Sequence, residues 1–262
     1  YTGKRAPAGS KPCFLTNLES IDIDTEEDLR HAISIEHSRL YQQSMQMRAL
    51  ASSFGSAQLG DTLWDHHLPA SPGLGNVQNF RTSFLGPAVT MSLLPIGVHQ
   101  PIEGIYDCLQ HYTYAYPGSV LTVQNPSGRA YFGGLNARLA TLAGCSGLLT
   151  DGPTRDLDET RALNFPVSSS GYTFADVRGH MTCGSLNSKV VLQPSGHNLP
   201  PIEVYPTDLI FSDHEGACII PNHRFKAIIN DTLDRCRNEN RIAAAILDGH
   251  DIQSSLNDYG NF

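Results

Sequence analysis

The sequence predicts a layered α/β fold, because short apolar runs bounded by turn residues alternate with segments of helical periodicity from about residue 50 onward. The chain has 262 residues, of which 40% are hydrophobic and 17% are charged, as is ordinary for a globular protein. The length suits one large domain, or one domain with an extension. Strands are predicted at 85–94, 119–123, 147–151, 208–212 and 217–220, and helices at 101–116, 135–143 and 157–163.

Leu135, Leu139 and Leu142 fall on one face of the predicted helix 135–143. A longer amphipathic helix is expected from Ile229 to Ile246, followed by a polar tail from residue 248.

Residues 1–45 differ from the rest. Gly, Pro, Lys and Ser favour a loop up to residue 12, and a short alternating run at 21–23 precedes a helix start. Asp24 or Thr25 is the expected cap, with acids in the first turn and helix through Arg48.

Charge and composition exclude some classes of function. The net charge of -8, with no dense Lys/Arg run, argues against nucleic acid as the main partner. No apolar run reaches the roughly 18 residues that a membrane span needs. The six cysteines form no C-x-x-C pair, so free thiols in a reducing, cytoplasmic location are expected.

Two adjacent glycines, Gly133 and Gly134, open the helix that continues through Leu135 and Asn136. The first N–H groups of a helix lack intrahelical partners and carry partial positive charge, and glycine lets a ligand approach them closely. These four residues therefore form a candidate site for a carboxylate or an enolate oxygen. The alternative is tight packing of helix against strand, with no ligand.

Arg155 and Asp156 follow the predicted strand that ends at Asp151. Ligands of open α/β sheets sit beyond the carboxyl ends of strands, so this pair and the glycines are expected to face one crevice. Arginine suits bidentate carboxylate recognition, and aspartate offers a hard oxygen ligand for Mg²⁺ or Mn²⁺. The alternatives are a surface ion pair for Arg155 and, for Asp156, a capping box with Glu159.

From about Phe54 to Tyr259 an ordered series of segments resembles the RraA-like family. That family includes 4-hydroxy-4-methyl-2-oxoglutarate aldolases, oxaloacetate decarboxylases and regulators of ribonuclease activity. The segments are GPAVT at 86–90, PGSVL at 117–121, DGPTRD at 151–156, RAL at 161–163, FPV at 165–167, RGH at 178–180, DLIFSD at 208–213 and GACIIP at 216–221.

The resemblance implies a swivelling β/β/α phosphohistidine-domain-like fold and a metal-dependent lyase. It places a 2-oxo acid on the backbone amides of Gly133, Gly134, Leu135 and Asn136, and its carboxylate on a catalytic Arg155. Asp156 would hold a divalent cation, Mg²⁺ or Mn²⁺, partly through water, and a pyruvate enolate would be stabilised there. Family members assemble as trimers or dimers of trimers, with sites between subunits.

One position departs from the aldolase pattern. The aldolases carry an acidic residue twenty residues before Arg-Asp, and this chain has Gly134 there. The missing carboxylate removes a base, a water-orienting group or an outer contact of the metal. The alternative function is therefore a non-catalytic trimeric regulator or binding module.

The segment from Thr2 to Leu29 resembles the end of an acylneuraminate cytidylyltransferase, in which aspartates matching Asp22 and Asp24 contact a metal. We therefore expect residues 1–45 to be the remnant of an upstream domain, and residues 46–262 to be the aldolase-like domain. The alternative is an unrelated acidic strand and helix. Such a fusion would indicate a 3-deoxy-2-oxo sugar acid as substrate.

Overall fold

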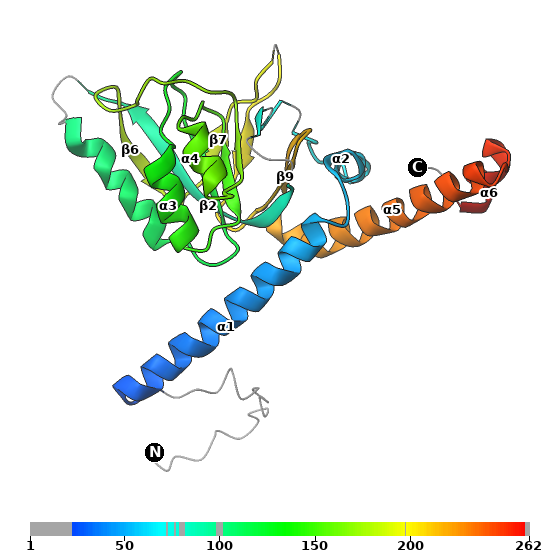
Figure 1. Ribbon diagram of the computed structural model, residues 1–262, viewed down its shortest axis with the longest axis horizontal. Helices are drawn as coiled ribbons and strands as arrows, with labels where there is room; N and C mark the ends of the chain where they lie inside the picture. Colours follow the sequence, from blue (N-terminus) through cyan, green and yellow to red (C-terminus); the bar gives the residue numbers. More distant parts are fainter. Residues whose placement is uncertain are drawn as a thin grey trace, which may run out of the picture.

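The computed structural model describes residues 23–259 apart from 72, 76, 79–81, 98–101 and 197. A curled sheet with helices forms the body, and two long helices, α1 and α5, extend from it in different directions (Figure 1). The helices are α1 (Glu26–Ala51), α2 (Ser56–Asp65), α3 (Gly134–Leu142), α4 (Leu157–Ala162), α5 (Phe225–Leu247) and α6 (Ile252–Tyr259), with 3-10 segments η1 (Ile102–Thr113) and η2 (Asn222–Arg224). Within the described residues, no helix combines the length and hydropathy that crossing a bilayer needs.

The main sheet has eight strands, and β2 joins its two parts. The first residues of β2 pair antiparallel with β9, its middle pairs parallel with β3, and its end pairs antiparallel with β6. Burial along β2 is nearly continuous, as expected for a strand covered on both faces. The strands are β1 (Val77–Gln78), β2 (Phe84–Pro95), β3 (Val120–Gln124), β4 (Gly147–Thr150), β5 (Val167–Ser169), β6 (Met181–Leu186), β9 (Leu209–Asp213) and β10 (Gly216–Ile220), while β7 (Val190–Leu192) and β8 (Ile202–Val204) form a separate pair.

The five strands expected from the apolar runs are confirmed, with ends displaced by at most one residue. The parallel run β3, β4 and β5 brings the carboxyl ends of those strands to one edge of the sheet. The segment expected to be a helix at 101–116 is instead the 3-10 segment η1. The mixed α/β architecture agrees with the fold implied by the family resemblance.

The apolar face of α3 does not contact the sheet. Leu135, Leu139 and Leu142 of α3 face away from the sheet, and Leu135 and Leu142 are 78% and 84% exposed. The buried face consists of small residues, Gly134, Ala137 and Ala140, which let α3 lie close to the strands. The three leucines do share one helix face, as the sequence predicts, but in the single chain this face is exposed to solvent.

The predicted helix start near Thr25 is confirmed. The Thr25 hydroxyl accepts from the Asp28 amide at 3.1 Å, and the Asp28 carboxylate accepts from the Thr25 amide at 2.9 Å, so the two form a capping box. The expected division between residues 1–45 and 46–262 falls inside α1, which runs unbroken to Ala51. Residues 1–22, including most of the segment that resembles a cytidylyltransferase, lie outside the described residues.

A buried histidine links η1 to the central strand. His111 is 1% exposed, and its Nε2 lies 2.8 Å from the carbonyl oxygen of Val89 on β2. Burial lowers the pKa of His111 from its usual 6.5 to about 4. The folded state therefore holds this imidazole neutral, while the unfolded chain binds a proton below pH 6.5.

We predict that the free energy of unfolding falls as the pH drops from 6.5 towards 4, by about 3 kcal/mol from His111 alone. The variant His111→Gln keeps an N–H donor for the Val89 carbonyl but cannot titrate. Urea unfolding of both proteins at several pH values measures the difference. A difference in unfolding free energy between the two that stays constant from pH 7 to pH 4 would show that His111 does not titrate as proposed.

Candidate functional site

The residues singled out from the sequence meet at a hollow of about 630 Å³ between η1, the start of α3 and the loop after β4. Gly133, Leu135, Asn136, Arg155 and Asp156 all line it. Gly134, the first residue of α3, is buried and does not line the hollow itself. The expectation that the glycine pair and the Arg-Asp pair share one crevice agrees with this arrangement.

The N-terminus of α3 supplies free backbone donors. The first hydrogen bond of the helix runs from the Ala137 amide to the Gly133 carbonyl, at 2.9 Å. The Gly134 amide donates instead to Oδ2 of Asp156, at 2.9 Å. Among the described residues, the amides of Leu135 and Asn136 have no acceptor, so they remain available to an anion.

The side chain of Asn136 is already engaged. Its Nδ2 donates to the Tyr131 carbonyl at 2.8 Å, and its Oδ1 accepts from the Tyr112 hydroxyl at 3.1 Å. These contacts fix the first turn of α3 and leave only the backbone of Asn136 for a ligand. The hydroxyl of Tyr131 itself is buried without a partner, and burial holds its pKa well above the usual range.

Arg155 is held at one end and open at the other. Its Nη1 lies 2.7 Å from Oδ2 of Asp176, and its backbone amide donates to the Phe132 carbonyl at 3.0 Å. Its Nε is buried and donates no hydrogen bond in the described structure, although Oδ2 of Asp156 lies 3.7 Å away. A buried, unpaired guanidinium N–H is costly, and a bound carboxylate would satisfy it.

Asp156 does not cap α4 in the way that the capping-box alternative requires. It occupies the N-cap position with a positive φ of 56°, and its side chain makes no cap hydrogen bond to α4. The carboxylate turns back to α3 and accepts from Gly134 instead. The spacing of Asp156 and Glu159 resembles a capping box, but neither side chain is used for one.

Glycine is required at 133 because Asp156 approaches so closely. A Cβ placed on Gly133 would lie 2.3 Å from Oδ2 of Asp156 and 3.1 Å from Cγ of Arg155. Any larger residue would push this pair away from the helix. The glycine thus serves the close contact with side chains of the same protein, whether or not a ligand is present.

Three residues of the site were not found from the sequence. Asp176 orients Arg155, Arg138 lines the hollow, and the carboxylate of Glu159 reaches the start of α3. Asp176 lies only two residues before the RGH segment at 178–180, which was the one available signal. Arg138 and Glu159 have no local signal, because both occupy exposed helix positions with ordinary surface composition.

The donor set limits the kind of metal that fits. Among the described residues, no group of three or more His, Cys, Asp or Glu side chains is arranged to hold an ion. Asp156 offers Oδ1, which accepts no hydrogen bond from any described residue, and its side chain is 40% exposed. One carboxylate with access to water suits Mg²⁺ or Mn²⁺, which keep several water ligands, and does not suit a structural zinc site.

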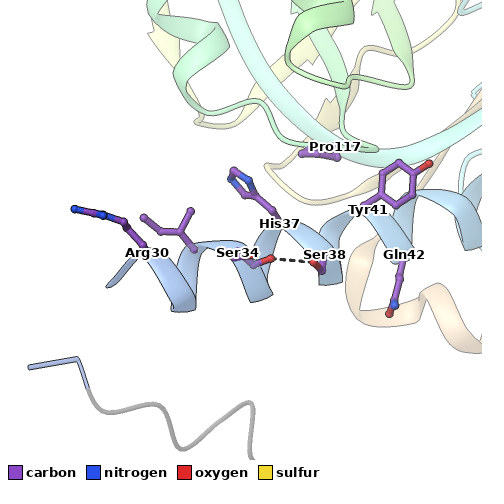
Figure 2. A pocket seen from close by; sticks show the side chains of 8 residues that line it. Arg30, Ser34, His37, Ser38, Tyr41, Gln42 and Pro117 are labelled. Carbon is purple, nitrogen blue, oxygen red and sulfur yellow. Dashed lines mark hydrogen bonds between the residues drawn. The ribbon is translucent and has the colours of Figure 1, made fainter. Parts of the chain in front are cut away.

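Another hollow, of about 770 Å³, runs along α1 beside Pro117 (Figure 2). Seven of its eight lining residues come from this one helix, and Arg30, His37 and Tyr41 are spaced along it (Figure 2). No carboxylate lines it, and no two of these polar groups converge on one point in the groove. It is therefore a weaker candidate than the hollow at α3.

Residues 56–219 match the family model described as RraA-like, Aldolase/RraA. The chain is 26% identical over 183 residues to Protein DlpA of Legionella pneumophila, covering 67% of this chain but only 27% of DlpA. It is 25% identical over 172 residues to a putative 4-hydroxy-4-methyl-2-oxoglutarate aldolase of Halalkalibacterium halodurans, covering 65% of this chain and 75% of that protein.

Solved structures agree on the fold. RraAS2 of Streptomyces coelicolor, titled an unusual member of the RNase ES inhibitor RraA protein family, superposes with a TM-score of 0.62 at 20% identity. The match covers 74% of this chain and 95% of that structure. At this identity the likeness shows the fold alone.

The unpaired Nε of Arg155 predicts binding of a small dicarboxylate such as oxalate. Arg155→Lys keeps the charge but loses the planar fork, so oxalate should bind at least about tenfold more weakly, since a hydrogen bond to a charged group contributes about 1.5–3 kcal/mol. Arg161→Lys, on the exposed side of α4, is the matched control. Isothermal titration calorimetry measures all three proteins, and equal affinities would assign Arg155 to a purely structural ion pair.

Proposed function

The chain belongs to the RraA-like (Aldolase/RraA) family, and on that premise we propose that it is a divalent-metal-dependent carbon–carbon lyase acting on a 2-oxo acid. The observation that carries the proposal is the buried, unpaired Nε of Arg155 beside the free amides of Leu135 and Asn136. The three donors belong to residues that line one hollow, and a carboxylate is negatively charged, planar and able to accept from all of them.

In the proposed complex the amides of Leu135 and Asn136 hold oxygens of the 2-oxo acid, and Arg155 binds its carboxylate. Asp176 keeps Arg155 in position through the 2.7 Å ion pair. Asp156 is the residue that would hold Mg²⁺ or Mn²⁺, with water and the substrate supplying the other ligands. The cation would supply Lewis-acid polarisation of the substrate carbonyl, which lowers the energy of a pyruvate enolate.

Both aldol cleavage and decarboxylation release pyruvate by way of its enolate, so one site serves either reaction. The fixed donors of α3 and Arg155 stabilise the charge that develops on the enolate oxygen and carboxylate. Two substrate classes follow: 4-hydroxy-2-oxo acids and oxaloacetate. A 3-deoxy-2-oxo sugar acid, suggested by the N-terminal resemblance, is one member of the first class.

We also propose that the site is completed by assembly as a homotrimer or a hexamer. The exposed Leu135 and Leu139 of α3 and Leu109 of η1 lie around the hollow, and Leu142 continues the same helix face. Contiguous exposed leucines are typical of a protein interface. A neighbouring subunit on this face would shield the hollow from water.

Light scattering tests the assembly. The mass of one chain is 28.5 kDa, so a trimer has three times that mass, about 86 kDa. Leu142→Asp, at an 84% exposed position, should yield smaller species without lowering the melting temperature of the isolated fold. A wild-type monomer at micromolar concentration would contradict both the assembly and a site between subunits.

A coupled assay of pyruvate release tests the lyase. We expect turnover of oxaloacetate or a 4-hydroxy-2-oxo acid with Mg²⁺ or Mn²⁺, and loss of turnover with chelator. Asp156→Asn should preserve the fold, because asparagine tolerates positive φ and can accept from the Gly134 amide. It should bind Mn²⁺ at least about tenfold more weakly in calorimetry, since a neutral amide replaces a charged ligand.

Equal Mn²⁺ affinity of wild type and Asp156→Asn, or no binding by either with oxalate present, would contradict the metal role of Asp156. The alternative, a non-catalytic trimeric regulator, would then account better for Gly134. That alternative predicts no pyruvate release from any 2-oxo acid with either cation.

A further inference from the structure

Gly134 faces a carboxylate that comes from another helix. A Cβ placed on Gly134 would lie 2.2 Å from Oε2 of Glu159, 2.7 Å from its Cδ and 3.0 Å from its Cβ. The volume that a side chain at 134 would enter is thus filled by the carboxyl end of Glu159. Residue 134 itself carries no carboxylate, but the carboxylate of Glu159 occupies the volume that a side chain at 134 would enter.

The backbone of the loop directs Glu159 there. Asp156 adopts a positive φ of 56°, and α4 begins directly after it with Glu159 in its first turn. Oε2 of Glu159 lies 3.6 Å from Nη2 of Arg138, one turn further along α3. Arg138 also lines the hollow, so Glu159 lies beside one residue of the lining without lining the hollow itself.

The two carboxylates on either side of Gly134 are in different states. Asp156 accepts from the Gly134 amide at 2.9 Å and contacts Arg155, so it is engaged. Glu159 accepts no hydrogen bond from any described residue, and its side chain is 55% exposed. The Glu159 carboxylate is therefore open to solvent, while that of Asp156 is engaged by groups of the protein.

We propose that Glu159 is the acid–base group of the lyase, and that it works through a water at the rim of the hollow. The proposal rests on the lyase function proposed above. In aldol cleavage the proton of the C4 hydroxyl passes through this water to Glu159 as the C3–C4 bond breaks. The electron pair of that bond passes into the pyruvate enolate, and the other fragment leaves as a carbonyl compound. The protonated Glu159 then returns the proton to C3 and yields pyruvate.

In decarboxylation the bond to the departing CO₂ supplies the same electron pair, and Glu159 delivers to C3 a proton that it regains from water. The same carboxylate therefore serves both reactions without any further co-reactant.

Glu159→Gln tests the proposal, because it keeps the size of the side chain and removes its proton chemistry. We expect kcat for pyruvate release to fall by about 10²-fold or more, with KM little changed. The acidic limb of the kcat profile against pH should disappear as well. Deuterium uptake at the methyl group of pyruvate in D₂O, followed by NMR, should slow by a similar factor.

Asp158→Asn is the matched control, since Asp158 is an exposed acid in the same turn of α4. A second pair of variants moves the carboxylate. Glu159→Ala should be as impaired as Glu159→Gln. Adding Gly134→Glu to Glu159→Ala should raise kcat at least tenfold above that of Glu159→Ala alone. Thermal melting of each variant confirms that the fold is retained.

The outcomes separate the two proposals. If wild type releases pyruvate and Glu159→Gln matches Asp158→Asn in rate and pH profile, Glu159 has no acid–base role and only this inference is overturned. If wild type releases no pyruvate from any substrate, the lyase function fails, and the role of Glu159 fails with it. A slow Glu159→Gln variant, together with recovery of activity when Gly134→Glu is added to Glu159→Ala, supports both.

Discussion

The site depends on one close contact, in which the carboxylate of Asp156 meets the N-terminus of α3. The hydrogen bond from the Gly134 amide fixes the loop after β4 against the helix, at 2.9 Å. It requires glycine at 133, because a Cβ there would collide with the carboxylate, and it requires the positive φ of Asp156. Negative charge at a helix N-terminus is itself favourable, so the contact also stabilises the fold. The side chain of Arg155 lies between the carboxylates of Asp156 and Asp176.

The sequence predicted the strands and the meeting of the two motifs, because both follow from local pattern and from a general rule about strand ends. The confirmed cap at Thr25 depends on residues three positions apart. Prediction failed where a residue that fits a local sequence pattern makes its contact with an element far away along the chain. Asp156 and Glu159 have the spacing of a capping box, yet both turn to α3, whose position depends on the tertiary fold. Asp176 was missed for the same reason, since its partner Arg155 lies far away along the chain.

The leucines of α3 illustrate a different limit. Periodicity identifies an apolar face but not what covers it, and here small residues such as Ala137 and Ala140 cover the sheet instead. The exposed face lies beside the hollow, so the surface proposed to contact a neighbouring subunit adjoins the surface proposed to bind a ligand. Family membership agrees with either a lyase or a regulator. What favours the lyase is the unpaired donor of Arg155, together with two carboxylates that bracket Gly134.

The central claim is that a metal on Asp156 and a carboxylate on Arg155 and α3 share this hollow. A crystal structure with Mn²⁺ and oxalate, using the anomalous signal of manganese, tests it most directly. The account predicts a manganese peak in contact with Asp156, and oxalate oxygens bonded to Arg155 Nε and to the amides of Leu135 and Asn136. A structure without manganese at Asp156, with Arg155 Nε still unpaired and oxalate bound elsewhere or not at all, would contradict it.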